Sequence, residues 1–338
     1  MSKFDGQLDA ELAPDQPLID AFEQDSLRSS LLTLYDPNSN QTTYLPGTEP
    51  SIQQTYYWLG RLARQLKQDR TTEFLIERMQ SSWLETPRQK QLYQISIGLI
   101  TGLMIAMIYG TTTGLIGASL GGLSYGLILA CSQEIYPIPR LRLSFEFAKA
   151  RLLGSVLEGL WWGLIYGLID AVICGLIWGV EGIILGMTDS LVWGLIEGII
   201  WGVLVPEFGH ITVSNQEIKE SAVNAGIFTG IGGVAWVILY IGALLAIGEP
   251  LEPLDLLLDG IGNGIFFGIY VGGLACIQHV VLRLILKQNG AIPWNYAKFL
   301  NYATELGFLE RQGGCYRFIH DSVQEHFAQM SLNDKTLT

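Results

Sequence analysis

The longest apolar stretch of the chain runs from residue 152 to residue 205 and reads LLGSVLEGLWWGLIYGLIDAVICGLIWGVEGIILGMTDSLVWGLIEGIIWGVLV. It contains no Lys, Arg or His, and its only charged residues are five acids. A helix needs about 20 apolar residues to cross the hydrocarbon core of a bilayer. The stretch is therefore long enough for two tilted membrane spans or for three short ones.

Further apolar segments lie on both sides of this stretch. Hydrophobic residues make up 49% of the 338-residue chain and charged residues only 15%, a balance that favours a membrane protein over a soluble globule. We therefore expect an all-α integral membrane protein with about six Gly-rich transmembrane helices and a small winged-helix-like C-terminal module. The expected spans lie near residues 94–110, 113–131, 152–176, 180–205, 221–247 and 260–286.

Polar segments precede and follow this expected membrane domain, which covers residues 94–286. Residues 1–50 carry two basic and nine acidic side chains among many turn-forming residues, which predicts a partly disordered segment. In residues 51–93 apolar side chains recur at helical spacing among seven basic and four acidic ones, which predicts a basic amphipathic helical segment. Residues 287–338 have the pattern of a cytoplasmic helix, hairpin and helix module.

The positions of the basic residues predict the topology, because Lys and Arg in short loops favour the cytoplasmic side. Basic residues precede the first span, occur in the 132–151 loop and follow the last span. The charged residues of the 248–259 loop, in contrast, are all acidic. Six spans with both termini in the cytoplasm place every basic cluster inside and the acidic loop outside. Seven spans remain an alternative, since no basic residue locates the turns within residues 152–205.

Glycines recur at intervals of four residues in the expected spans, and 32 of the 39 glycines lie between residues 94 and 286. On a helix this spacing lines one face with small residues, so another helix can approach closely in lipid. We expect these faces to pack within the bundle, with oligomerisation or an oligomeric pore as the alternative. The helix-packing candidates are Gly159, Gly163, Gly167, Gly194, Gly198, Gly202, Gly260, Gly264, Gly268 and Gly272.

The five acids of the 152–205 stretch are candidates for an ion pathway. A carboxylate in hydrocarbon is costly, so its presence is by default a hypothesis of function. A proton or cation pathway would use such groups, whereas several of them would lie at turns or headgroup level if the spans end near residue 181. The five acids are Glu158, Asp170, Glu181, Asp189 and Glu197.

No motif in the sequence predicts catalysis, a cofactor or a metal. The four histidines and four cysteines have no metal-ligand spacing, and neither a phosphate-binding G-x-x-x-x-G-K-[ST] loop nor a G-x-S-x-G nucleophile turn occurs. The formal net charge of −12 argues against a nucleic acid as partner. We therefore expect a protein that is not an enzyme.

The C-terminal third contains the runs GGLACIQH at 272–279, IPWNYAKFL at 292–300, YRFIH at 316–320 and QEHF at 324–327. With these runs it resembles the C-terminal membrane region of bacterial NACHT-domain signal-transducing NTPases of the STAND class. Two further stretches look similar, WLGRLARQL at 58–66 and NQEIK at 215–219. The resemblance covers roughly residues 52–330. The sequence departs from the domain plan of that family, because it contains no NTPase domain.

The resemblance implies a non-catalytic anchor or effector module in a bacterial cell membrane, in contact with membrane lipid. Its partner would be a separate NTPase or further copies of the chain. The alternative function is an ion or small-solute channel or transporter, built from glycine-packed helices with intramembrane carboxylates.

Overall fold

The computed structural model describes residues 44, 48–132, 134–207, 211–247 and 252–333. Most of the predicted acidic N-terminal segment at 1–50 therefore lies outside the described residues. The described chain is mostly helical, which confirms the helical class predicted from the sequence. Its membrane part contains α4 (Pro87–Ala130), α5 (Phe145–Trp178), α6 (Val180–Val203), α7 (Gln216–Ile247), α8 (Pro253–Gly268), the π-helical turn η3 (Ile269–Gly273) and α9 (Leu274–Gln288).

Five of the described helices are long and apolar enough to cross a membrane, one fewer than the six expected. The difference lies in α4, which folds back on itself at Gly114, where φ is 69° and ψ is −164°. Its first arm, Pro87–Ile108, is long enough to span, whereas its second arm, Gly114–Ala130, is shorter. The arms approach closely, since a Cβ on Gly102 would lie 2.7 Å from the carbonyl oxygen of Gly122.

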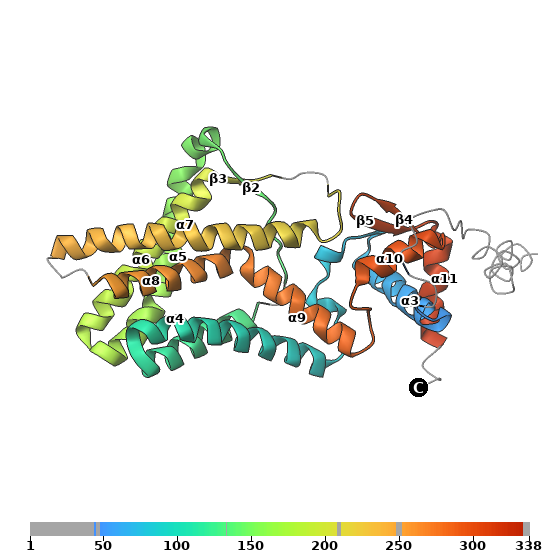
Figure 1. The fold of residues 1–338 in the computed structure, drawn as a ribbon, viewed down its shortest axis with the longest axis horizontal. Coiled ribbons are helices and arrows are strands. Elements are labelled where there is room, and N and C mark those ends of the chain that lie inside the picture. The colour runs from blue at the N-terminus through green and yellow to red at the C-terminus, as the bar shows by residue number, and fades with distance from the viewer. Residues whose placement is uncertain (1–43, 45–47, 133, 208–210, 248–251, 334–338) are drawn as a thin grey trace, which may run out of the picture.

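The helices pair as antiparallel neighbours (Figure 1). The α5 and α6 helices form a hairpin at Gly179, a residue with φ of 68°. The α7 helix lies against α8, which continues through η3 into α9. Two short strands, β2 (Leu141–Leu143) and β3 (Leu204–Pro206), pair antiparallel beside the bundle, so the chain is not purely helical.

The beginning of α8 differs from the sequence prediction. Residues 248–259 were expected to form an external loop, but α8 starts at Pro253, with Glu252 at its N-cap position. Proline is favoured in the first helical turn because its missing N–H would have no helical partner there. The segment that contains Asp255 and Asp259 is therefore part of the helix.

A soluble domain lies at one end of the bundle and contains both ends of the described chain (Figure 1). It consists of α3 (Ile52–Asp69), β1 (Glu73–Phe74), η1 (Ile76–Arg78), η2 (Ser81–Trp83), α10 (Tyr296–Glu305), β4 (Leu309–Gln312), β5 (Cys315–Phe318) and α11 (Asp321–Asn333). The strands form one sheet in the order β1-β5-β4. A single hydrophobic core joins α3, α9, α10 and α11, so the two ends of the described chain fold together.

Candidate functional site

A cavity of about 390 Å³ lies inside the membrane bundle, between α4, α5, α6, α7 and α8. This volume falls in the range of sites that bind small molecules. Among the described residues that line it there is no Lys, Arg or His. Five acids line it instead, namely Asp170, Asp189, Glu197, Asp255 and Asp259.

Two of these acids are held by hydroxyl donors. Tyr125 donates to Asp170 Oδ1 over 3.0 Å, and Ser190 donates to Asp170 Oδ2 over 2.6 Å. Tyr270 in η3 donates its hydroxyl hydrogen to Glu197 Oε1. These hydrogen bonds fix the positions of the two carboxylates and lower the cost of burying them.

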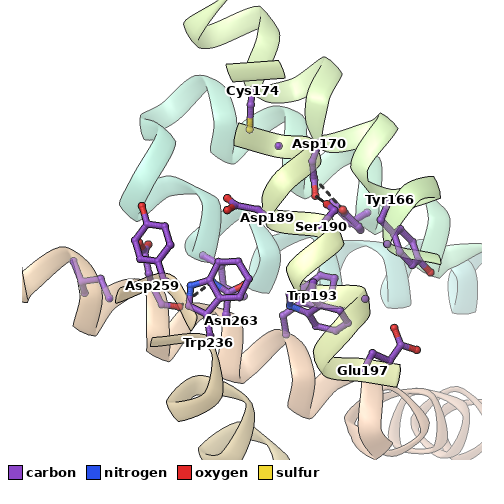
Figure 2. Close-up of a pocket in the computed structure, with 18 of the residues that line it drawn as sticks. Tyr166, Asp170, Cys174, Asp189, Ser190, Trp193, Glu197, Trp236, Asp259 and Asn263 are labelled. Atoms are coloured by element: carbon purple, nitrogen blue, oxygen red, sulfur yellow. Dashed lines mark hydrogen bonds between the residues drawn. The ribbon is translucent and has the colours of Figure 1, made fainter. Parts of the chain in front are cut away.

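Two other acids lack such donors. The carboxylates of Asp189 on α6 and Asp259 on α8 make no hydrogen bond or ion pair with the rest of the described chain. Figure 2 shows the two side chains on different helices that border the same space. An unpaired carboxylate in this setting is costly. A cation bound in this space would pair with the two carboxylates and offset that cost.

Aromatic rings form much of the remaining wall. Trp193 stacks on Phe267 with ring centroids 4.0 Å apart, and its ring meets Phe266 edge to face at 4.9 Å. Trp236 stacks on Tyr240 with centroids 6.1 Å apart. The aromatic residues that line the cavity are Tyr125, Tyr166, Trp178, Trp193, Trp236, Tyr240 and Phe266.

A buried nitrogen of this wall also has no hydrogen-bond partner within the described residues. The indole Nε1–H of Trp236 is buried and makes no hydrogen bond within the described residues, and the side chain is only 5% exposed. Buried indole groups usually find a hydrogen-bond acceptor. Trp236 is among the residues that line the cavity.

The structure separates the five acids predicted from the sequence into two groups. Asp170, Asp189 and Glu197 line the cavity, whereas Glu158 and Glu181 are exposed and lie outside its lining. Asp255 and Asp259 were not among the acids predicted from the sequence, because both were expected in a loop. The signal was present, since Asp255, Asp259 and Asn263 recur every four residues and so share one face of a helix.

The glycines of α5 and α6 bring these two helices into backbone contact. A Cβ on Gly159 would lie 2.1 Å from Gly194 O, and one on Gly163 would lie 2.5 Å from Ser190 O. A Cβ on Gly198 would lie 2.5 Å from Val156 Cα. A Cβ on Gly167 would lie 3.3 Å from Met187 Sδ, and a Cβ on Gly202 would lie 2.8 Å from Leu152 Cδ1.

The glycines of α8 and η3 face α7 in the same way. A Cβ would lie 2.5 Å from Val237 Cγ2 at Gly260, 2.3 Å from Thr229 O at Gly264 and 2.1 Å from Thr229 Oγ1 at Gly268. Gly272 also has a conformational role, because its φ is 121° and a Cβ there would lie 2.4 Å from Ser221 O. All ten candidate glycines thus contact helices of the same chain.

The soluble domain contacts the start of α7 directly. Glu77, whose side chain is fully buried, accepts the backbone N–H of Asn215 at 3.1 Å, and Ser214 and Tyr316 share a hydrogen bond of 2.9 Å. Burial raises the pKa of the Glu77 carboxyl above its usual value. One oxygen of Glu77 has no hydrogen-bond partner within the described residues.

The acids do not converge on a metal site. Among the described residues, no group of three or more His, Cys, Asp or Glu side chains lies close enough together to hold a metal ion. The cavity is thus an acidic and aromatic chamber with dispersed carboxylates. A scan against models of known families, and searches of the curated proteins and of the solved structures, found no match.

Proposed function

We propose that the protein is a non-catalytic membrane effector module that binds a cationic solute in its bundle and transmits this binding to its soluble domain. One observation carries the proposal, the direct connection of α8 through the kinked turn η3 to α9 between Pro253 and Gln288. Its α8 part lines the acidic cavity, and Leu282 and Leu286 in its α9 part are fully buried in the core of the soluble domain. A displacement at one end of this segment would therefore be transmitted to the other end.

The turn η3 provides a place where such a shift can occur. Val271 and Gly272 interrupt the helical dihedral angles between α8 and α9, and π-helical turns of this kind are frequent at functional sites. Tyr270 within η3 bonds to Glu197 of the cavity wall. Ligand binding next to Glu197 would therefore change the environment of the turn.

The topology of this proposal has six crossings and both ends of the chain in the cytoplasm. Because α3 and α11 pack in one soluble domain, the chain must cross the membrane an even number of times between them. The proposal counts the five long helices and the shorter α4 arm, Gly114–Ala130, as six crossings. The cavity then lies toward the external side, because the N-terminal half of α8 points away from the soluble domain (Figure 1).

The resemblance to NACHT NTPase membrane regions supports the effector role. The helix, hairpin and helix of residues 296–333 would serve as the winged-helix-like cytoplasmic module, with α3 and β1 completing it. In this scheme its partner is a separate NTPase or another copy of the chain, and lipid surrounds the bundle.

Hydrogen–deuterium exchange of the full chain in lipid nanodiscs tests this function. Choline, K⁺ and Ca²⁺ serve as probes, and the expected result is altered exchange in residues 296–333 with at least one of them. The double variant Asp189→Asn and Asp259→Asn should abolish the change. Binding without any effect on the soluble domain would contradict the effector role.

The second candidate is a channel or transporter, favoured by the same acid-lined cavity within the membrane. Flux of the bound cation into sealed liposomes distinguishes the two, because only a transporter carries its ligand across. Flux that depends on Asp189 would replace the effector proposal, whereas exchange changes without flux would support it.

A further inference from the structure

We propose that the cavity binds an organic ammonium ion that also carries a hydrogen-bond acceptor, as in an amino alcohol. The inference rests on the proposed function, for which it names the ligand class. The proposal rests on three properties of the wall: its charge, its aromatic surface and a buried donor, Trp236 Nε1–H, that has no partner within the described residues.

The charge of the wall favours a positive ligand. Asp170 and Glu197 are occupied by hydroxyl donors, whereas Asp189 and Asp259 have no partner in the described chain. No described residue of the lining is basic. A neutral or anionic ligand would leave these carboxylates unpaired in a medium of low polarity, which is unfavourable.

The spread of the carboxylates favours an organic cation over a metal ion. A divalent metal ion needs several oxygen ligands within about 2.0–2.6 Å. No three acidic side chains of the described residues are arranged for this, and the chamber of about 390 Å³ is far larger than such an ion. A substituted ammonium ion fills more of this space and can face carboxylates on two walls.

The aromatic rings supply the second part of the recognition. Ammonium groups are attracted to the faces of Trp and Tyr rings, and quaternary ammonium ions are typically held in aromatic cages. Trp193, Trp236 and Tyr240 line the chamber, and stacking holds Trp193 against Phe267 and Trp236 against Tyr240. The rings are therefore fixed before a ligand enters.

The indole N–H of Trp236 supplies the third part. It is a buried donor at the cavity wall with no acceptor in the described chain, so a cation without an acceptor leaves it unsatisfied. A hydroxyl, ether or ester oxygen next to the ammonium group would accept this hydrogen. The same chemistry occurs in free amino alcohols and in the choline or ethanolamine headgroup of a lipid.

Calorimetric titration of the full chain in phosphatidylglycerol nanodiscs tests the inference, because this lipid has no ammonium group. The probes are choline, tetramethylammonium, K⁺ and Ca²⁺. We expect both organic ions to bind, with choline about 3- to 10-fold tighter because its hydroxyl accepts one further hydrogen bond. Equal affinities of the two organic ions for the native chain would overturn the role of the acceptor.

Three variants locate the site. Asp189→Asn should weaken both organic ions by about tenfold or more, whereas Glu158→Gln, an exposed acid outside the cavity, should leave them unchanged. Trp236→Phe keeps an aromatic ring but removes the N–H, so the preference for choline over tetramethylammonium should fall to about one. Affinities that do not respond to Asp189→Asn would overturn the site.

Binding of the inorganic ions distinguishes a failure of this inference from a failure of the proposed function. Binding of K⁺ or Ca²⁺ that depends on Asp189, without binding of either organic ion, would overturn this inference and leave the proposed function standing. If no cation binds, both fail. Native mass spectrometry of protein from phosphatidylcholine membranes identifies the source of the ligand. A lipid that the native chain retains and the Asp189→Asn variant loses would show that the site binds a lipid headgroup. If no lipid is retained although choline binds, the ligand is a free solute.

Discussion

The backbone N–H of Asn215, the residue before α7, donates to Glu77 Oε2 at 3.1 Å and so joins the soluble domain to the N-terminus of α7. The two residues are 138 positions apart in the chain. A carboxylate near a helix N-terminus also interacts favourably with the helix dipole. The soluble domain therefore contacts two neighbouring membrane segments at the same end of the bundle, α7 through Glu77 and α9 through its core.

The buried Glu77 predicts a pH dependence of stability. Burial is the main cause that raises its pKa, and nearby Glu217 raises it further, while the Asn215 hydrogen bond and Arg78 lower it. Because the folded pKa lies above the unfolded one, the stabilising contribution is complete at low pH and is lost as pH rises through the folded pKa. Glu77→Gln should remove this loss and raise the melting temperature at neutral pH, measured in detergent from pH 4 to 8.

The variant keeps an amide oxygen that can accept the Asn215 N–H, so the connection to α7 is preserved. A melting temperature for Glu77→Gln that falls with pH as steeply as that of the native chain would contradict the assignment. Glu325, which is paired with Lys67 on the surface, provides a control position for the loss of one acid.

The close contact of α5 and α6 predicts a strong effect of one methyl group. A Cβ on Gly159 would lie 2.1 Å from Gly194 O and 2.7 Å from Gly198 N, so the helices must separate to accommodate it. Gly159→Ala should lower the free energy of unfolding by about 1–3 kcal/mol. Gly154→Ala is the matched control, because a Cβ at this position of the same helix meets nothing within 4 Å.

Thermal unfolding of both variants in the same detergent measures the difference. Equal melting temperatures would show that the helices do not meet along the Gly159 face.

The shared core of the soluble domain predicts that damage near the N-terminus exposes the C-terminus. Leu62 on α3 is 1% exposed and belongs to the same core as Phe299 and Phe327. Leu62→Ala should cost about 2–5 kcal/mol and speed the proteolysis of residues 296–333. Tyr57→Ala on the exposed face of the same helix should leave the digestion rate unchanged.

Unaltered digestion of the Leu62 variant would mean that residues 296–333 fold without α3.

The contact between the chain ends predicts their location on one side of the membrane. Lys67 Nζ and Glu325 Oε2 are 2.7 Å apart, and both side chains are partly exposed. In a variant without native cysteines, Lys67→Cys and Glu325→Cys should resist a membrane-impermeant maleimide on intact cells. Glu252→Cys, at the opposite end of the bundle, should react.

Labelling of position 67 or 325 from outside would overturn the cytoplasmic orientation, and labelling of only one of them would contradict the even number of crossings.

The sequence was sufficient to predict the class of the protein. Long apolar runs without basic residues, such as residues 152–205, must form helices in lipid because every backbone polar group needs an internal partner. The four-residue spacing of glycines marked the helix faces that approach closely. Both signals depend only on residues that are close together in the sequence, so they can be recognised without the tertiary structure.

The cavity and the joining of the chain ends depended on contacts between distant segments. Asp189 and Asp259 are 70 positions apart, and only the packing of α6 near α8 places them on one chamber. Likewise, α3 and α11 meet because their apolar faces are buried in one core together with α9 and α10. Local patterns specify which residues form a helix, whereas the surroundings of a side chain depend on which helices pack together, and that is a property of the folded bundle.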